Sequence, residues 1–228
     1  MKRKRVEEME KEKKEGSEMS CAIEALSMGV LKFKADDHST TAHIATKPFL
    51  CVCRNLLLHV LDKIGSSMTV LRQDIHQNIQ ILEKLHDSDP SVYSNMVELL
   101  KKEATEGIAK KGSSCSKAFV WLTRSLDFSL ALLQQLVEDF EKNMERAVEE
   151  SYTITLKPWH GWISSAAYKV ALKLVPDTRS LITILMARDK NSDILKKEMQ
   201  ALISLLEPAL QEIHNLLEIY GLDRLKSI

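Results

Sequence analysis

The sequence has little of what marks several protein classes. Its 228 residues contain seven glycines and five prolines, and lysine plus arginine equal aspartate plus glutamate at 32 each. With a formal net charge of zero, no overall field draws the chain toward nucleic acid. We therefore expect no nucleic-acid partner.

Cysteine is also scarce, and its spacing does not form a metal site. Cys51 and Cys53 have one residue between them, no second pair follows, and Cys21 and Cys115 stand alone. This is not the spacing of a zinc site. We expect reduced thiols, no metal and no cofactor.

Long apolar runs are missing. No window approaches the roughly 20 apolar residues that span a bilayer, and the opening MKRKRVEEMEKEKKEG has no signal-peptide core. We expect a cytosolic protein. Residues 1–18 carry 13 charges and almost nothing apolar, which predicts a disordered or frayed helical tail before a single domain at 19–228.

The usual enzyme motifs are absent as well. There is no G-x-S-x-G, no H-E-x-x-H and no glycine-rich phosphate loop. Asp74 and His160 are the residue types of an acid–base pair, but no nucleophile is marked beside them. We expect a protein that is not an enzyme.

What the chain does have is helical periodicity from Met19 onward, without a competing strand signal. We predict about eight helices in a compact all-α domain, with caps at Ser66 or Ser67 and at Ser113 or Ser114 and a kink or break at Pro208. The expected ranges are 49–64, 66–86, 92–109, 117–143, 145–156, 160–175, 182–187 and 193–220.

Two polar residues interrupt the stretch LRQDIHQNIQIL. Asp74 and Asn78 lie about 100° round the helix from a stripe that we expect to be buried. Either they are solvated or cap a neighbouring segment, or they form an acceptor and a donor that reach into a cleft. The stripe consists of Met68, Leu71, Ile75, Ile79 and Leu82.

Aromatic residues mark two further stretches. KAFVWLTRSLDF places Lys117, Trp121 and Arg124 on one helix face, where a tryptophan either packs in the core or stacks on a sugar. In PWHGWI, tryptophans flank His160, a residue that is usually a structural hydrogen-bonder. Trp162 has the character of a membrane-interface anchor.

The motifs D-I-H-Q-N at 74–78, V-W-L-T-R at 120–124 and W-H-G-W-I at 159–163, in this order, resemble the glycolipid transfer protein family, most closely its plant-type cytosolic members. The resemblance runs from about Lys47 to the C-terminus. It implies a two-layer helical sandwich. The lipid headgroup then lies at the surface, and the acyl chains enter an apolar tunnel between the layers.

By motif position, Asp74 resembles the carboxylate that accepts hydrogen bonds from the sphingosine amide and a sugar hydroxyl. Asn78 resembles the amide that binds the sugar. Trp121 resembles the plate under the first sugar ring, and His160 the donor to the ceramide amide carbonyl. An amide offers one donor and one acceptor, so a carboxylate and an imidazole N–H are able to hold it from opposite sides.

The resemblance also assigns apolar positions. Trp162 corresponds to the membrane-docking tryptophan. Tunnel-lining positions, which are equally compatible with ordinary core, are Val60, Met68, Leu71, Leu156 and Leu172.

Two positions leave the headgroup open. Ile81 stands where the glycolipid-binding branch usually has a lysine, and Lys117 is a feature of the branch that binds phosphosphingolipids. Asn78 and Trp121 are glycolipid-type, and an indole face suits a sugar better than a phosphate. The balance favours a neutral or simple glycosphingolipid.

These features together predict a monomeric, non-enzymatic carrier that docks transiently on membranes and transfers glycosylceramides between them. Two alternatives stay open: transfer of ceramide-1-phosphate, and a lipid sensor or interaction module that uses the same pocket. The charged tail is the one feature that favours a partner.

Overall fold

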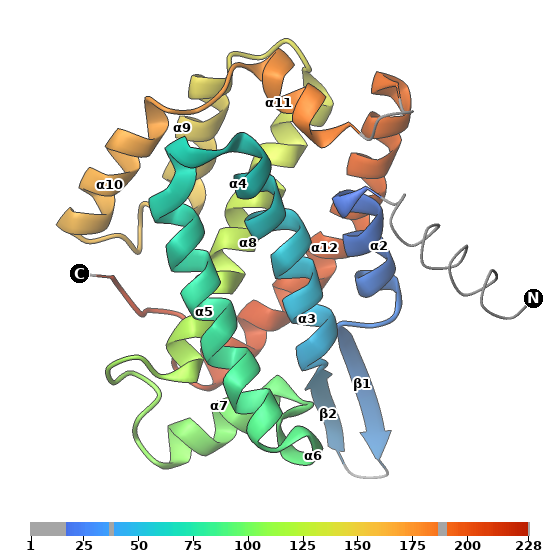
Figure 1. Cartoon of the computed structure of the whole chain (residues 1–228). Coiled ribbons are helices and arrows are strands. Elements are labelled where there is room, and N and C mark those ends of the chain that lie inside the picture. Colours follow the sequence, from blue (N-terminus) through green and yellow to red (C-terminus); the bar gives the residue numbers. More distant parts are fainter. Residues whose placement is uncertain (1–16, 37–38, 187–190, 228) are drawn as a thin grey trace, which may run out of the picture.

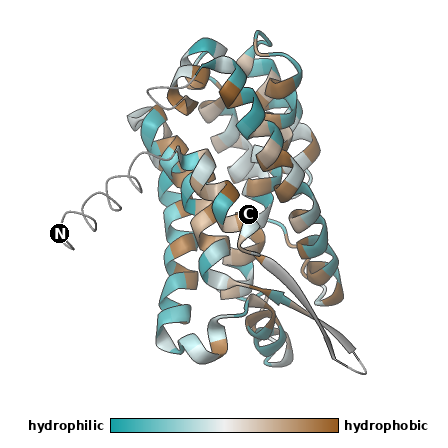
Figure 2. Ribbon diagram, turned by 90° about the vertical axis from the view of Figure 1, so that its right-hand side faces the viewer, coloured by the Kyte–Doolittle hydropathy of each residue, from teal (hydrophilic) through white to brown (hydrophobic). Residues whose placement is uncertain are grey.

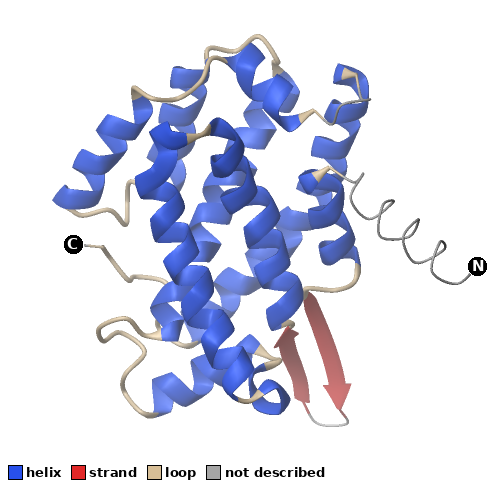
Figure 3. Cartoon of the chain, in the orientation of Figure 1, coloured by secondary structure: helices blue, strands red, loops and turns tan. Residues whose placement is uncertain are grey.

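The computed structural model describes residues 17–36, 39–186 and 191–227. Helices dominate this part of the chain, as Figure 3 shows, and the predicted all-α class is confirmed. A π-helical turn, Arg54–Leu58, joins α3 to α4, and a 3₁₀ turn, Ser66–Met68, precedes α5. The helices are α2 Glu18–Ser27, α3 Thr46–Cys53, α4 His59–Ile64, α5 Thr69–Ser88, α6 Pro90–Tyr93, α7 Met96–Thr105, α8 Cys115–Glu138, α9 Met144–Thr155, α10 Trp162–Leu172, α11 Thr178–Leu185 and α12 Ser192–Ile219.

The N-terminal boundary lies slightly earlier than expected. Residues 1–16 of the predicted tail are outside the described residues. Ser17 is buried and caps α2, since its hydroxyl accepts a hydrogen bond from the backbone N–H of Ser20 at 3.1 Å. Of the last two residues of the predicted tail, Glu18 thus begins α2 and Ser17 caps it.

Several helix starts follow local capping chemistry, among them the start of α8. Ser114 caps α8 by accepting from the N–H of Lys117 at 3.2 Å, as predicted. The cap predicted at Ser66 or Ser67 is wrong. Gly65, at φ 104°, turns the chain sharply, and the 3₁₀ turn leads into α5 without a side-chain cap.

The predicted helix 92–109 is two helices. α6 ends at Tyr93 and α7 begins at Met96, because Asn95 leaves helical geometry and uses its side-chain oxygen as an acceptor. That oxygen binds the N–H of Val97 at 3.1 Å and the N–H of Ile44 at 3.0 Å. The second bond ties this corner to a strand that sequence periodicity missed.

That strand belongs to a β-hairpin. β1 (Leu31–Asp36) and β2 (Ser39–Ile44) pair antiparallel with Leu31 opposite Ile44, so the expectation of no strand is wrong here. The segment LKFKAD alternates with period two, but six residues are too short to outweigh helical patterns on either side. The segment becomes a strand because it pairs with β2.

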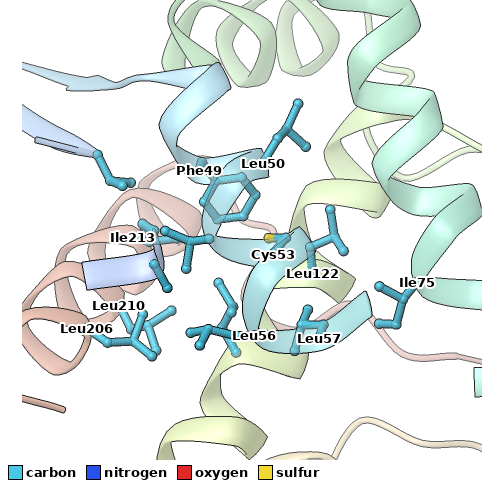
Figure 4. Packing of buried hydrophobic residues seen from close by; sticks show 14 of the residues in the cluster. Phe49, Leu50, Cys53, Leu56, Leu57, Ile75, Leu122, Leu206, Leu210 and Ile213 are labelled. Carbon is cyan, nitrogen blue, oxygen red and sulfur yellow. The ribbon is translucent and has the colours of Figure 1, made fainter. Parts of the chain in front are cut away.

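The helices form two layers. α3 and α4, joined by the π-helical turn, lie with α5 in front of α8 and α12 (Figure 1). α2 packs against α3 and α12. Single helices carry both hydrophobic and hydrophilic residues, as amphipathic helices do (Figure 2). Between the layers, Phe49, Leu57, Leu122 and Ile213 meet in one buried core (Figure 4). The predicted two-layer sandwich is confirmed.

α12 continues through Pro208 as one helix, so the proline does not break it. Leu206 and Leu210, on either side, are buried and hold both halves against the core. Within the described residues, none of the helices combines the length and apolarity needed to cross a bilayer.

Candidate functional site

The polar edge of α5 carries Asp74 and Asn78, one turn apart. Buried Ile75 and Ile79 hold the helix in the core, while Asp74 is exposed and Asn78 half-buried. The Asn78 side-chain amide donates to the backbone oxygen of Asp74 at 3.0 Å. No described residue donates to the Asp74 carboxylate, and desolvation by nearby protein atoms raises its pKa. A carboxylate left unpaired at the edge of the core is available to a ligand.

The predicted buried stripe of α5 is correct at four positions and wrong at one. Met68, Ile75, Ile79 and Leu82 are at most 7% exposed, but Leu71 is 38% exposed. Leu71 lies in the first turn of α5.

α8 presents Trp121 beside a buried cation. Arg124 is 3% exposed, and its guanidinium lies 4.9 Å from the Trp121 ring centre and 4.3 Å from that of Trp159. It donates to the backbone oxygens of Leu225 at 2.5 Å and Asp223 at 2.8 Å. Burial lowers the pKa of Arg124 to about 10, so it is charged at neutral pH. Arg124 thus fixes both tryptophans and the C-terminal segment.

His160 follows a tight turn at the end of α9. Its ring lies 5.8 Å from that of Trp121, centre to centre, at 45°. Its Nδ1 lies 3.2 Å from the hydroxyl of Tyr152. Burial, and then the positive charge of Arg124, lower the pKa of His160, so the neutral imidazole is favoured.

Lys117 lies in the first turn of α8, one turn before Trp121. It is half-buried, and its ammonium donates to the backbone oxygen of Gly112 at 2.9 Å. The cation is therefore engaged with the loop that precedes α8.

The fold brings the predicted residues together in two groups. Trp121 and His160 are in ring contact although they come from different elements. Asp74 and Asn78 belong to α5, which packs along α8, the helix that carries Trp121 (Figure 1).

Sequence analysis missed three supporting residues. Tyr152 contacts His160, Arg124 was placed on a helix face without a role, and Ser227 fixes the turn after Trp159. The Ser227 N–H donates to the Trp159 oxygen at 2.9 Å, and its hydroxyl accepts from the Gly161 N–H at 3.0 Å. An arginine among apolar residues was the only signal in the sequence. The Ser227 contact with Gly161 joins residues 66 positions apart, and the Tyr152 contact depends on the turn between α9 and His160.

Comparisons with known proteins agree with this architecture. The family described as Glycolipid transfer protein (GLTP) matches residues 44–187. Glycolipid transfer protein 3 of Arabidopsis thaliana is 52% identical over 235 residues, with all of both chains covered. This chain belongs to the glycolipid transfer protein family.

Solved structures show that the chain has the GLTP fold. The GLTP fold of FAPP2, in a structure concerned with its selection of simple glycosphingolipids, aligns with a TM-score of 0.74 at 21% identity, covering 90% of this chain and 99% of that one. A variant of Arabidopsis ACD11 in complex with ceramide-1-phosphate aligns at 0.73 and 18%, covering 90% and 96%. The fold thus accompanies both headgroup classes.

α10 of this family member has an exposed apolar surface. Trp162 is 76% exposed and Val170 64% exposed, and no residue of the helix is fully buried. Lys169 and Lys173 are exposed near its C-terminal end. Apolar and basic residues together are typical of helices that lie at a membrane interface.

The five positions that the glycolipid transfer protein resemblance assigned to a tunnel differ in burial. Met68 is buried, Leu71 is exposed, and Val60, Leu156 and Leu172 are half-buried. Leu172 of α10 packs against the main core. Their role in holding lipid chains stays a prediction.

Proposed function

We propose that this chain carries glycosphingolipids, in particular simple glycosylceramides, between membranes without chemical conversion. Family membership supports sphingolipid binding, and the Trp121 indole beside neutral His160 supports a sugar headgroup above a ceramide amide. The His160 N–H and the unpaired Asp74 carboxylate suit the amide carbonyl and amide N–H. Asn78 lies beside Asp74 for a sugar hydroxyl.

The choice of a sugar headgroup over a phosphate rests on the hydrogen bonds that Arg124 and Lys117 already make. A phosphate usually recruits two or more free cationic donors. Here the Arg124 guanidinium is buried and bound to two backbone oxygens, and the Lys117 ammonium is bound to Gly112. Neither is set to meet a phosphate, whereas an indole face is ready for a sugar ring.

The carrier function follows from the cost of exposing lipid chains to water. Each exposed CH₂ costs roughly 0.8 kcal/mol, so a lipid with two long chains leaves a membrane slowly by itself. We assign shielding of those chains to the apolar interior between the helix layers, entered near Met68, Leu156 and Leu172. The protein works as a cytosolic monomer in this proposal.

Vesicle transfer tests the proposal. We expect the protein to move labelled glucosylceramide from donor to acceptor vesicles, and to move ceramide-1-phosphate more slowly, since the Arg124 and Lys117 cations are already bound to backbone oxygens. Fluorescence energy transfer between lipid labels measures both rates. Faster transfer of ceramide-1-phosphate would overturn the headgroup choice, and an inert protein would overturn the carrier proposal.

Trp162 is expected to dock the protein on the membrane. Trp162→Ala removes a large exposed ring that an interface would bury, so binding to vesicles should weaken about tenfold. Vesicle sedimentation measures it. The matched control is Ile219→Ala, which removes an apolar side chain that is 73% exposed at the end of α12. Equal losses in the two variants would show that α10 is not the docking helix.

A further inference from the structure

Tyr152 of α9 is the one described side chain that hydrogen-bonds to the His160 ring. Its hydroxyl lies 3.2 Å from Nδ1, and the two rings are 5.4 Å apart, centre to centre, at 58°. Tyr152 is 4% exposed. No described residue hydrogen-bonds to the other ring nitrogen, Nε2.

The backbone and a second ring hold Tyr152 firmly. Its ring stacks on that of Tyr168 at 3.4 Å and 5°. Its backbone oxygen accepts from the N–H groups of Leu156 at 3.1 Å and Lys157 at 3.0 Å, and the N–H of His160 then donates to Leu156 at 3.1 Å. One turn of chain therefore fixes the phenol relative to the imidazole.

The contact between phenol and imidazole has two proton arrangements. If His160 carries its proton on Nδ1, the tyrosine oxygen accepts it, and the buried hydroxyl hydrogen has no acceptor among the described residues. If Tyr152 donates to Nδ1, the hydroxyl is satisfied and the imidazole proton lies on Nε2. Burying an unpaired donor is unfavourable, so the second arrangement is preferred.

The charge state makes this choice matter. Burial, and then the positive charge of the Arg124 guanidinium held over Trp121 and Trp159, lower the pKa of His160 and disfavour a charged imidazole. A neutral imidazole has one N–H, and which nitrogen carries it decides whether Nε2 donates or accepts.

We propose that Tyr152 is a positioning residue that selects the tautomer of His160 with its proton on Nε2, so that this nitrogen donates to a carbonyl oxygen of the ligand. The inference rests on the proposed function for the identity of that carbonyl, the lipid amide. Without the phenol hydroxyl, part of the His160 population carries its proton on Nδ1. In those molecules Nε2 presents a lone pair to the carbonyl oxygen, which it repels.

Nitrogen NMR of the imidazole tests the tautomer directly, without lipid. We expect the wild-type ring to carry its proton on Nε2 and Tyr152→Phe to give a mixture of tautomers. The matched control is Tyr168→Phe, in the same stack, whose hydroxyl is buried without a hydrogen-bond partner. It should leave the His160 signals unchanged. A wild-type proton on Nδ1, or an unchanged tautomer in Tyr152→Phe, would overturn the proposal.

Lipid binding tests the consequence. Glucosylceramide affinity should fall about three- to tenfold in Tyr152→Phe, the effect of one weakened hydrogen bond. Tyr93→Phe, which removes a hydroxyl paired with Lys102 at 2.6 Å, is the control and should bind normally. A changed tautomer with unchanged affinity would overturn the positioning role. If the wild-type protein binds no glucosylceramide, the proposed function fails while the NMR result still decides the tautomer.

Discussion

Replacing Asp74 with asparagine is expected to lower glucosylceramide transfer on the order of 10- to 100-fold, the effect of losing a hydrogen bond to a charged group. Asparagine keeps the size of the side chain but presents an amide where the proposed lipid amide N–H needs a strong acceptor. The vesicle transfer rate measures the loss, and it should appear without any loss of folded protein.

The stability of the same variant should move in the opposite direction. Because desolvation raises the pKa of Asp74 in the folded state, ionising it opposes folding at neutral pH. The asparagine variant should therefore be slightly more stable than wild type at neutral pH. That advantage should vanish as the pH falls through the raised pKa, where the wild-type carboxyl takes up its proton. Thermal unfolding at several pH values measures this.

A matched control for Asp74→Asn lies on the same helix. Asp87 is exposed, and among the described residues its carboxylate contacts only His86, at 3.2 Å. Asp87→Asn should transfer lipid at the wild-type rate. Comparable transfer by Asp74→Asn and wild type would remove Asp74 from the site.

Arg124→Met is expected to lower the free energy of unfolding by about 3 kcal/mol, or roughly 6 to 12 °C in melting temperature. The variant leaves the backbone oxygens of Asp223 and Leu225 without their charged donor and removes the cation between Trp121 and Trp159. The C-terminal segment should loosen as a result. Denaturant titration and hydrogen exchange at residues 222–227 measure the two effects.

The control for Arg124→Met is an exposed arginine. Arg146 is paired with Glu150 at 2.7 Å, with its side chain 75% exposed, so Arg146→Met should cost less than about 1 kcal/mol. Similar losses in the two variants would show that burial of Arg124 adds nothing to the stability of the fold.

Helices were predictable because their signals are local. The 3.6-residue periodicity around Ile75 and Ile79 and the capping serine at Ser114 need no partner to be read. The hairpin was missed because its strands are stabilised by pairing with each other. The cap predicted at Ser66 or Ser67 was wrong because Gly65 turns the chain and a 3₁₀ turn leads into α5. The break at Asn95 depends on a bond to Ile44, 51 residues away.

The site divides in the same way. The sequence by itself determined the all-α class, the family and the residue types Asp74, Asn78, Trp121 and His160, since these depend on short motifs and their order. Only the tertiary structure decided that the Arg124 and Lys117 cations are already engaged, and that Tyr152 meets Nδ1 of His160. The Arg124 bonds join residues 99 and 101 positions apart. The Lys117 and Tyr152 contacts are closer in sequence, but they depend on how a loop and a turn fold back onto a helix, which is decided only once the chain has packed.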